Sequence, residues 1–284
     1  FRWIEPGEFW MGSPDDEAER HSDEGPRHRV RLTAGYWLAE TACTQALWQA
    51  VMGDNPSHFK TDPLNPVEQV SWDDVQAFLE RAQAMWSGVT LELPTEAEWE
   101  FACRAGTETP FSCGATISPA QANYDGSHPY CAAEKGLYRE KTVRVKSFAP
   151  NPWGLYEMHG NVWEWCADGQ RQYDGEPHEN PRGPEAVGDE APRVVRGGAW
   201  LVYAGGLRSA YRDQGRRDLR GHDQGFRFSL RSTGQAAGAE RLQQGNMPEA
   251  PEGPQGRAAL PGRQGRAISA DAETPRSGVD KLLD

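Results

Sequence analysis

The sequence predicts an α+β fold in a single domain, and three observations lead to this prediction. The 11 tryptophans, eight tyrosines and nine phenylalanines all precede Ser232, so a core can form only before that residue. Signals for helices fall within residues 44–106. From Phe111 to Arg231 the chain is rich in loops and carries short apolar segments that suit strands. Early helices joined to a long β region, without alternation, are typical of α+β proteins.

Residues 232–284 differ in composition from the rest of the chain. They are rich in Gly, Pro, Gln and Ala, and they show no aromatic residue and no apolar periodicity. Such a segment buries too little apolar surface to offset the entropy lost on ordering. We therefore predict one folded domain over residues 1–231 and a disordered tail over residues 232–284.

The N-terminal part of the chain predicts strands. Residues 3–13 alternate apolar and polar side chains, as a half-buried strand does. Residues 15–29 are dense in charge and predict a solvated loop. Two further strands are expected at residues 29–32 and 36–39.

Two early helices have strong start signals. Ser71 is followed three residues later by Asp74, and Thr95 by Glu98, which are the residue types of a capping box. These helices are expected over residues 71–86 and 95–106, where Gly106 ends the second. Their core-facing side chains are expected to be Val75, Phe78, Leu79, Trp99 and Ala102.

The remaining elements have weaker signals. A helix is expected over residues 44–52, which end at Gly53. Short antiparallel strands are expected beyond Phe111, for example at residues 194–196 and 225–228. Loops as long as those between them need an anchor besides a sheet, and a metal ion is the obvious candidate.

The charge of the chain bears on its partners. A net charge of −12 argues against nucleic-acid binding, which depends on neutralising phosphates. Residues 193–231 nevertheless hold nine arginines and three aspartates, a local charge of +6. This local surplus favours an acidic partner. We expect a monomer.

Cysteine usage and hydropathy exclude several classes of protein. The five cysteines include no Cys-x-x-Cys pair, so neither zinc nor thioredoxin-like chemistry is indicated, and we expect free thiols. No run of 18 apolar residues occurs, which excludes a membrane-spanning helix in this chain. Because the chain begins at Phe1, a signal peptide or a fused N-terminal segment is compatible with it, and both a cytoplasmic and a cell-surface location stay open.

A series of motifs runs through residues 3–231 in order. Its most informative members lie near the end of the domain. They are Gly-Leu-Tyr-Glu-Met-His-Gly-Asn-Val-Trp-Glu-Trp at 154–165, Arg-Gly-Gly-Ala-Trp at 196–200, Arg-Ser-Ala-Tyr-Arg at 208–212 and Gly-Phe-Arg at 225–227. Earlier members include Pro-Gly-Glu-Phe-Trp-Met-Gly-Ser at 6–13 and Leu-Pro-Thr-Glu-Ala-Glu-Trp-Glu at 93–100. Together they resemble the formylglycine-generating-enzyme (sulfatase-modifying factor) family. The resemblance implies a loop-rich C-type-lectin-like fold, and it leaves function open because that scaffold serves oxidases, sulfoxide synthases and non-catalytic binders.

The resemblance also implies structural calcium. The ligands at one site would be the carboxylates of Glu157 and Glu164 and the carbonyls of Gly160 and Val162, since Ca²⁺ takes carboxylate and carbonyl oxygens. The alternative is that Glu164 caps a segment or pairs with an arginine. A second site would use Asn123 with the carbonyls of Tyr124 and Tyr138. There the aspartate of the family falls on Gly136, which weakens the case for that site.

The redox centre of the family's oxidases is missing from the sequence. Those enzymes bind copper through two cysteines, since Cu(I) prefers thiolate ligands. In this sequence the two cysteines would lie between Trp200 and Arg212. Residues such as Val202 and Leu207 stand there instead, and the last cysteine is Cys166. We therefore expect no copper and no copper-dependent formation of formylglycine.

Iron chemistry has equally little support. The sulfoxide synthases that resemble this domain hold iron with three histidines, largely on a separate N-terminal domain that this chain lacks. The seven histidines here form no His-x-x-x-His pair. We expect His159 to be structural and His222 to be available for contact with a ligand.

The segment between Trp200 and Gln224 mixes apolar, aromatic, charged and small residues without core periodicity, which is typical of evolved binding surfaces. It resembles the variable proteins of diversity-generating retroelements, in which framework motifs stay fixed while the positions between them are diversified. The candidate ligand-binding residues are Leu201, Val202, Tyr203, Gly206, Tyr211, Asp213, Gly215, Arg216, Leu219, Gly221, His222 and Asp223. The alternative is ordinary drift in a catalytically inactive homologue.

The sequence therefore favours a non-catalytic domain that binds a protein or another macromolecule through residues 201–223. Two alternatives remain. One is a formylglycine-generating or sulfoxide-synthase-type oxidoreductase whose missing parts lie outside this chain. The other is a regulatory domain of a larger fusion protein.

Overall fold

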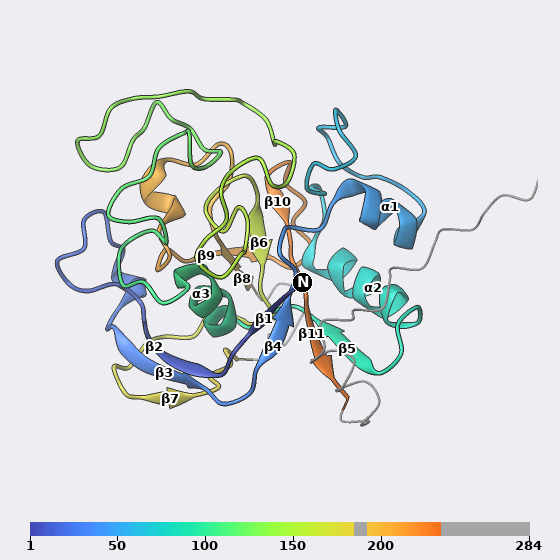
Figure 1. The fold of residues 1–284 in the computed structure, drawn as a ribbon, viewed down its shortest axis with the longest axis horizontal. Coiled ribbons are helices and arrows are strands. Elements are labelled where there is room, and N and C mark those ends of the chain that lie inside the picture. The colour runs from blue at the N-terminus through green and yellow to red at the C-terminus, as the bar shows by residue number, and fades with distance from the viewer. Residues whose placement is uncertain (185–191, 234–284) are drawn as a thin grey trace, which may run out of the picture. The chain divides into compact units, whose positions relative to one another are not determined.

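The computed structural model describes residues 1–184 and 192–233, all of which belong to one compact unit (Figure 1). Its helices are α1 (Gln45–Met52), α2 (Trp72–Gln83) and α3 (Glu96–Arg104), with short 3-10 turns η1 (Ser22–Glu24) and η2 (Ala204–Leu207). Its strands are β1 (Arg2–Ile4), β2 (Gly7–Met11), β3 (His28–Leu32), β4 (Tyr36–Leu38), β5 (Val89–Glu92), β6 (Trp163–Trp165), β7 (His178–Glu179), β8 (Pro192–Arg196), β9 (Asp213–Arg216), β10 (Gln224–Gly225) and β11 (Ser229–Ser232). The predicted α+β class is confirmed.

The strands form three small sheets. Their orders are β1-β4-β11-β5, β10-β6-β8-β9 and β2-β3-β7. Most pairings are antiparallel, as expected, and two, β10 with β6 and β3 with β7, are parallel. Both parallel pairs join segments that are distant in sequence, which hairpin signals cannot reveal.

The helix starts follow the capping residues. Ser71 accepts from the backbone N–H of Asp74, and Thr95 accepts from that of Glu98, with the reciprocal bonds of a full capping box in both. The weaker helix over residues 44–52 is also present, so three helices form where the fold prediction emphasised two. Figure 1 shows α1 and α2 side by side, at a distance from β2, β3 and β7.

Some boundaries differ from the expected ones. The opening segment forms two strands, because Pro6 has no N–H to continue the ladder. Helix α2 ends at Gln83, whose side-chain amide bonds the carbonyls of Trp86 and Val89 and turns the chain into β5. Strand β11 includes Ser232, one residue past the expected end of the domain, and the remaining predicted tail from residue 234 lies outside the described residues.

The core has three parts. All five predicted core side chains on α2 and α3 are buried. One cluster joins α1, α2, β5 and β11, and a second joins β2, β3, β4 and α3. A third and smaller cluster joins Phe111 and Tyr124 to Ala204 and Leu207, so η2 is tied to the long loop region.

Four buried arginines connect the last part of the domain to earlier segments. Arg208 bonds both oxygens of Glu24 at 2.6 and 2.7 Å, and Arg212 bonds both oxygens of Glu96 at 2.6 and 2.8 Å. The remaining two pairs are Arg196 with Glu100 and Arg227 with Glu164. Separating the partners of a buried ion pair leaves an uncompensated charge and is strongly destabilising. These pairs therefore fix which segments of the chain lie together.

Replacing Arg227 with Met is expected to lower the free energy of unfolding by about 3–5 kcal/mol, because it leaves the buried carboxylate of Glu164 without a counter-charge. Glu164→Gln combined with Arg227→Met is expected to recover part of that loss. Arg29→Met removes an exposed pair with Glu8 and is expected to cost about 1 kcal/mol or less. Urea unfolding measures all three, and equal losses for the two single variants would contradict the argument.

Candidate functional site

The candidate ligand-binding segment begins after a glycine pair with left-handed backbone. Gly197 has φ 94° and Gly198 φ 73°, conformations that favour glycine. A Cβ on Gly198 would also lie 2.7 Å from Cδ1 of Leu207 and 2.9 Å from the carbonyl oxygen of Gly206. The segment then passes through η2 and β9 before it reaches β10.

The twelve candidate residues are not equally accessible. The exposed ones are Leu201, Tyr203, Asp213, Arg216, Leu219 and His222. The half-buried ones are Val202, Tyr211, Gly221 and Asp223. Gly206 and Gly215 are buried, because a Cβ there would meet Val202 at 2.5 Å and Trp165 at 2.8 Å. Their burial favours a role in the framework over direct contact with a ligand.

Side chains from distant parts of the sequence complete this surface. The hydroxyl of Tyr203 lies 3.3 Å from Nε2 of His21, whose ring also packs edge-on against Tyr211 at 5.0 Å. On the other side of the segment, Tyr138 is stacked on Trp200 at 6.1 Å. None of these contacts has a signal in the spacing of the sequence, because each joins residues separated by long stretches of chain.

The residues around Trp200 form an aromatic group. Phe59 packs edge-on against Trp200 at 5.4 Å, and the ring of His222 lies 5.3 Å from it. The indole N–H of Trp200 donates to the carbonyl of His222 at 3.2 Å. Trp200 is buried, so it supports His222 from below and leaves that histidine exposed.

His159 has the structural role that was predicted for it. Its Nδ1 lies 2.7 Å from the carbonyl oxygen of Leu207, and its Nε2 accepts from the backbone N–H of Ser112. Burial lowers the pKa of His159 to about 4, so the ring stays neutral at physiological pH. This histidine fixes the end of η2 beneath the exposed segment.

The cysteines lie away from the exposed segment in sequence and are free thiols, as predicted. Cys43, Cys103 and Cys166 are buried, and burial raises the pKa of Cys103 to about 12. Val202 is half-buried and Leu207 is buried, and neither can supply a thiolate at the position of the family's redox pair.

The Glu157 and Glu164 set does not fit a calcium ion. Both oxygens of Glu164 accept from Arg227, and Oε2 also accepts from the indole N–H of Trp99 at 2.7 Å. The carboxylate of Glu157 accepts from the backbone N–H groups of Lys146 and Ser147. The guanidinium of Arg227 neutralises Glu164, and N–H donors already bond both oxygens of Glu157, which disfavours a cation at this set.

The Asn123 set fits better. Its Oδ1 is buried and has no hydrogen-bond partner among the described residues, while its Nδ2 donates to the carbonyl of Lys141 and to Asn161. The neighbouring Oγ1 of Thr142 is also buried and unpartnered within that part of the chain. Unmatched buried oxygens are what a hard cation would satisfy. No group of three or more His, Cys, Asp or Glu side chains in residues 1–184 and 192–233 is placed to hold a metal ion.

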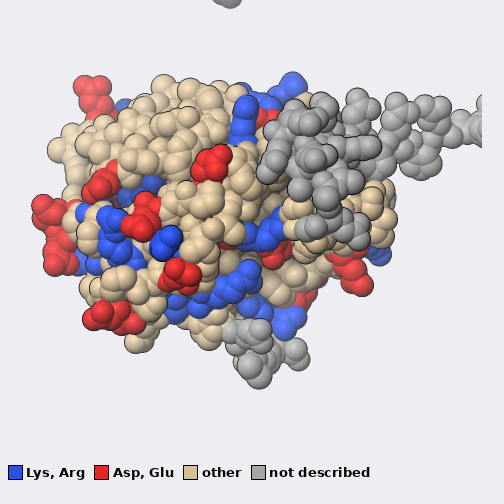
Figure 2. Space-filling model, turned by 60° about the horizontal axis from the view of Figure 1, so that its bottom comes forward, with Lys and Arg blue, Asp and Glu red and all other residues tan. Residues whose placement is uncertain are grey.

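The positive charge expected around the segment is neutralised from other parts of the chain. Arg217 bonds Asp73, Arg220 bonds Asp74, and Arg216 bonds Asp218. Basic and acidic side chains also lie interspersed on the face drawn in Figure 2. The count of +6 already includes Asp218, but it leaves out Asp73 and Asp74 and the glutamates that pair with the buried arginines of the segment. The local surplus therefore gives no basis for an acidic ligand. Across the ranges described, no helix has the length and hydropathy needed to cross a bilayer.

Comparison with known proteins agrees with this architecture. The formylglycine-generating enzyme of Streptomyces coelicolor is 34% identical over 229 residues, which are 74% of this chain and 69% of that enzyme. The serine/threonine-protein kinase pkn1 of Chlamydia pneumoniae is 34% identical over 166 residues, 57% of this chain and 23% of the kinase. This chain thus corresponds to only a part of each relative.

A solved structure supports the fold independently. Treponema denticola variable protein 1 superposes with a TM-score of 0.68 and 28% identity, over 81% of this chain and 94% of that one. The framework glycines, the buried arginine pairs and the motif series all fall within the range that the family model covers. The model of the sulfatase-modifying factor enzyme 1-like domain matches residues 2–231, and the chain belongs to this formylglycine-generating-enzyme family.

Proposed function

We propose that this domain binds a protein ligand through the exposed side chains of residues 201–223. The observation that carries the proposal is the separation of roles within the segment. Its glycines and arginines make buried contacts that fix the backbone, while six side chains point to solvent between them. Replacing those six changes the surface and leaves the core contacts in place, which a diversified binding surface requires.

The chemistry of the exposed side chains favours contact area over charge. Leu201, Tyr203 and Leu219 are three of the large apolar or aromatic side chains that are exposed in the described ranges. Tyrosine and arginine are enriched among the residues that supply most of the binding free energy in protein interfaces, and Tyr203 and Arg216 are exposed residues of these types. The similarity to Treponema denticola variable protein 1, which is named a variable protein, supports a surface whose residues can differ while the fold stays the same.

A library that randomises the six exposed positions together is expected to stay mostly folded. Exposed substitutions change the free energy of unfolding by about 0.5 kcal/mol or less each. Displayed on yeast, this library is expected to yield streptavidin binders after selection. A matched library at Gly197, Gly198, Gly206 and Gly215 is expected to lose protease-resistant display. A first library that is mostly unfolded, or that yields no binder, would contradict the proposal.

An oxidase function is the second candidate, because the Streptomyces coelicolor relative is a formylglycine-generating enzyme. Val202 and Leu207 cannot bind copper, and we expect the purified chain to leave the cysteine of a Cys-x-Pro-x-Arg peptide unchanged. The assay is mass spectrometry of the peptide with copper and a reductant, with the Streptomyces enzyme as a positive control. Conversion above a control without enzyme would favour the oxidase.

We also propose a structural calcium ion held by Asn123 with the carbonyls of Tyr124 and Tyr138. The unpartnered Oδ1 of Asn123 supports this assignment. A ligand that binds only the native state stabilises it by about 2.7 kcal/mol at a concentration 100 times its Kd. EDTA is therefore expected to lower the melting temperature, and calcium to restore it, in the natural chain but not in Asn123→Ala. Identical melting with EDTA and with calcium would rule the ion out.

A further inference from the structure

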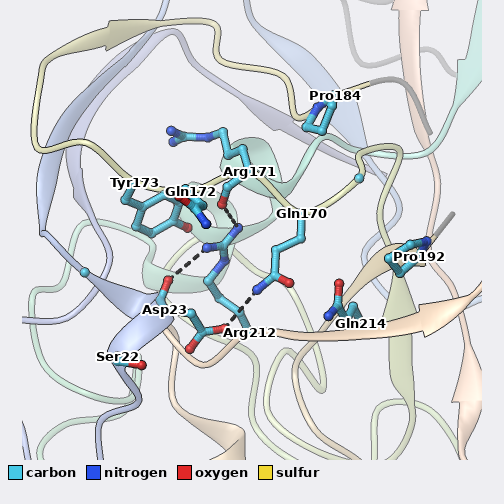
Figure 3. Close-up of a pocket in the computed structure, with 12 residues that line it drawn as sticks. Ser22, Asp23, Gln170, Arg171, Gln172, Tyr173, Pro184, Pro192, Arg212 and Gln214 are labelled. Carbon is cyan, nitrogen blue, oxygen red and sulfur yellow. Dashed lines mark hydrogen bonds between the residues drawn. The ribbon is translucent and has the colours of Figure 1, made fainter. Parts of the chain in front are cut away.

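A polar cavity of about 590 Å³ opens beside the ligand-binding segment (Figure 3). Four stretches of chain line it: residues 22–25, residues 169–173, the two prolines Pro184 and Pro192, and Arg212 with Gln214. Its volume lies within the range of about 300–1,000 Å³ that is common for ligand sites. None of its lining residues is among the six exposed positions described above.

The floor of the cavity is held by internal bonds. Arg212 is paired with Glu96 and also donates to the carbonyls of Asp23 and Arg171, at 2.9 and 3.0 Å. Gln170 donates to the carboxylate of Asp23 at 2.9 Å (Figure 3). These bonds hold the floor in place: the charge of Arg212 is paired with Glu96, while the carboxylate of Asp23 accepts from the neutral amide of Gln170 and keeps its charge.

The wall of the cavity offers amide groups. The side chains of Gln172 and Gln214 are exposed and form no hydrogen bond with the described residues. A carboxamide both donates and accepts, as a peptide group does. Tyr173 is buried, and two guanidinium groups lie over its ring, Arg171 at 4.6 Å and Arg212 at 4.1 Å. A ligand that depends on ring stacking, such as a sugar, therefore finds no open aromatic face on Tyr173.

The same wall carries the edge of a sheet. Strand β9 is the last strand in the order β10-β6-β8-β9. Gln214 lies opposite Val194 of β8, whose own backbone N–H and C=O bond Asp168 and Cys166 on the other side of that strand. The backbone N–H of Gln214 donates instead to the carboxylate of the adjacent Asp213 at 2.7 Å. An amide directed away from its sheet and capped only by a neighbouring side chain is positioned to pair with an added strand.

We propose that this cavity binds an extended peptide segment that adds to the edge of β9. The backbone of the segment pairs with Gln214, the carboxamides of Gln172 and Gln214 bond its peptide groups, and the two prolines contact its aliphatic side chains. This inference goes beyond the proposed function, because the cavity uses fixed residues and does not depend on the six exposed positions.

The test uses the full chain and a phage-displayed library of random heptapeptides. Peptides selected by the chain are expected to bind Gln172→Ala/Gln214→Ala about tenfold more weakly, as expected from the loss of one or two hydrogen bonds. The matched control is Gln49→Ala/Gln76→Ala, which removes two glutamines from the surfaces of α1 and α2. Its affinity is expected to equal that of the natural chain. Selection of no peptide, or equal affinity for both double variants, overturns the proposal.

Hydrogen exchange supplies a second readout. A bound peptide is expected to slow exchange of the Gln214 amide at least tenfold, while Leu201→Ala/Tyr203→Ala/Leu219→Ala leaves the peptide affinity unchanged. Unchanged exchange at Gln214 overturns strand addition. Loss of peptide binding in the triple variant assigns the peptide to the ligand-binding segment and also overturns the cavity site. Failure of the randomised library described above leaves these results unaffected, so the two proposals fail separately.

Discussion

The structure depends on ion pairs between late arginines and early carboxylates. Arg208 reaches Glu24, Arg212 reaches Glu96, and both pairs are bidentate and buried. A fold with short strands and long loops buries modest apolar area per element, so connections of this kind decide which loops meet. Breaking one pair leaves an uncompensated charge in the core. An arrangement of the backbone is therefore low in energy when each of these arginines meets its carboxylate.

This constraint is compatible with the binding surface proposed for residues 201–223. The segment after Gly198 is held at Leu207 by His159, at Arg208 by Glu24 and at Arg212 by Glu96. Between these attachment points the exposed side chains make few core contacts. Under the proposed function, stability and ligand binding therefore depend on different residues of the same segment, and a substitution that changes one need not change the other.

The elements that the sequence predicts well are those with local causes. The two capping boxes and Gly53 predicted the bounds of the helices to within a few residues, since a cap is made by residues that are close in the chain. The framework motifs gave the family. What could not be predicted depends on distant partners: the parallel pairing of β10 with β6, the burial of Gly215 against Trp165, and the aspartates that neutralise the arginines of the segment. For Glu164, pairing with an arginine was one of the alternatives, but the sequence did not identify Arg227 as the partner, because a carboxylate in a motif shows its chemistry and not its neighbour.

Strand β11 lies between β4 and β5 in the first sheet, although it is the last strand of the described residues. During synthesis, β4 and β5 leave the ribosome long before residues 229–232. Until β11 is made, neither strand has the partner that lies between them in the sheet. Contacts between the two ends of a chain form late, because closing a long loop costs entropy before the contacts repay it. The nascent domain therefore exposes two unpaired strand edges for most of its translation, a period in which chaperone binding would protect it from aggregation.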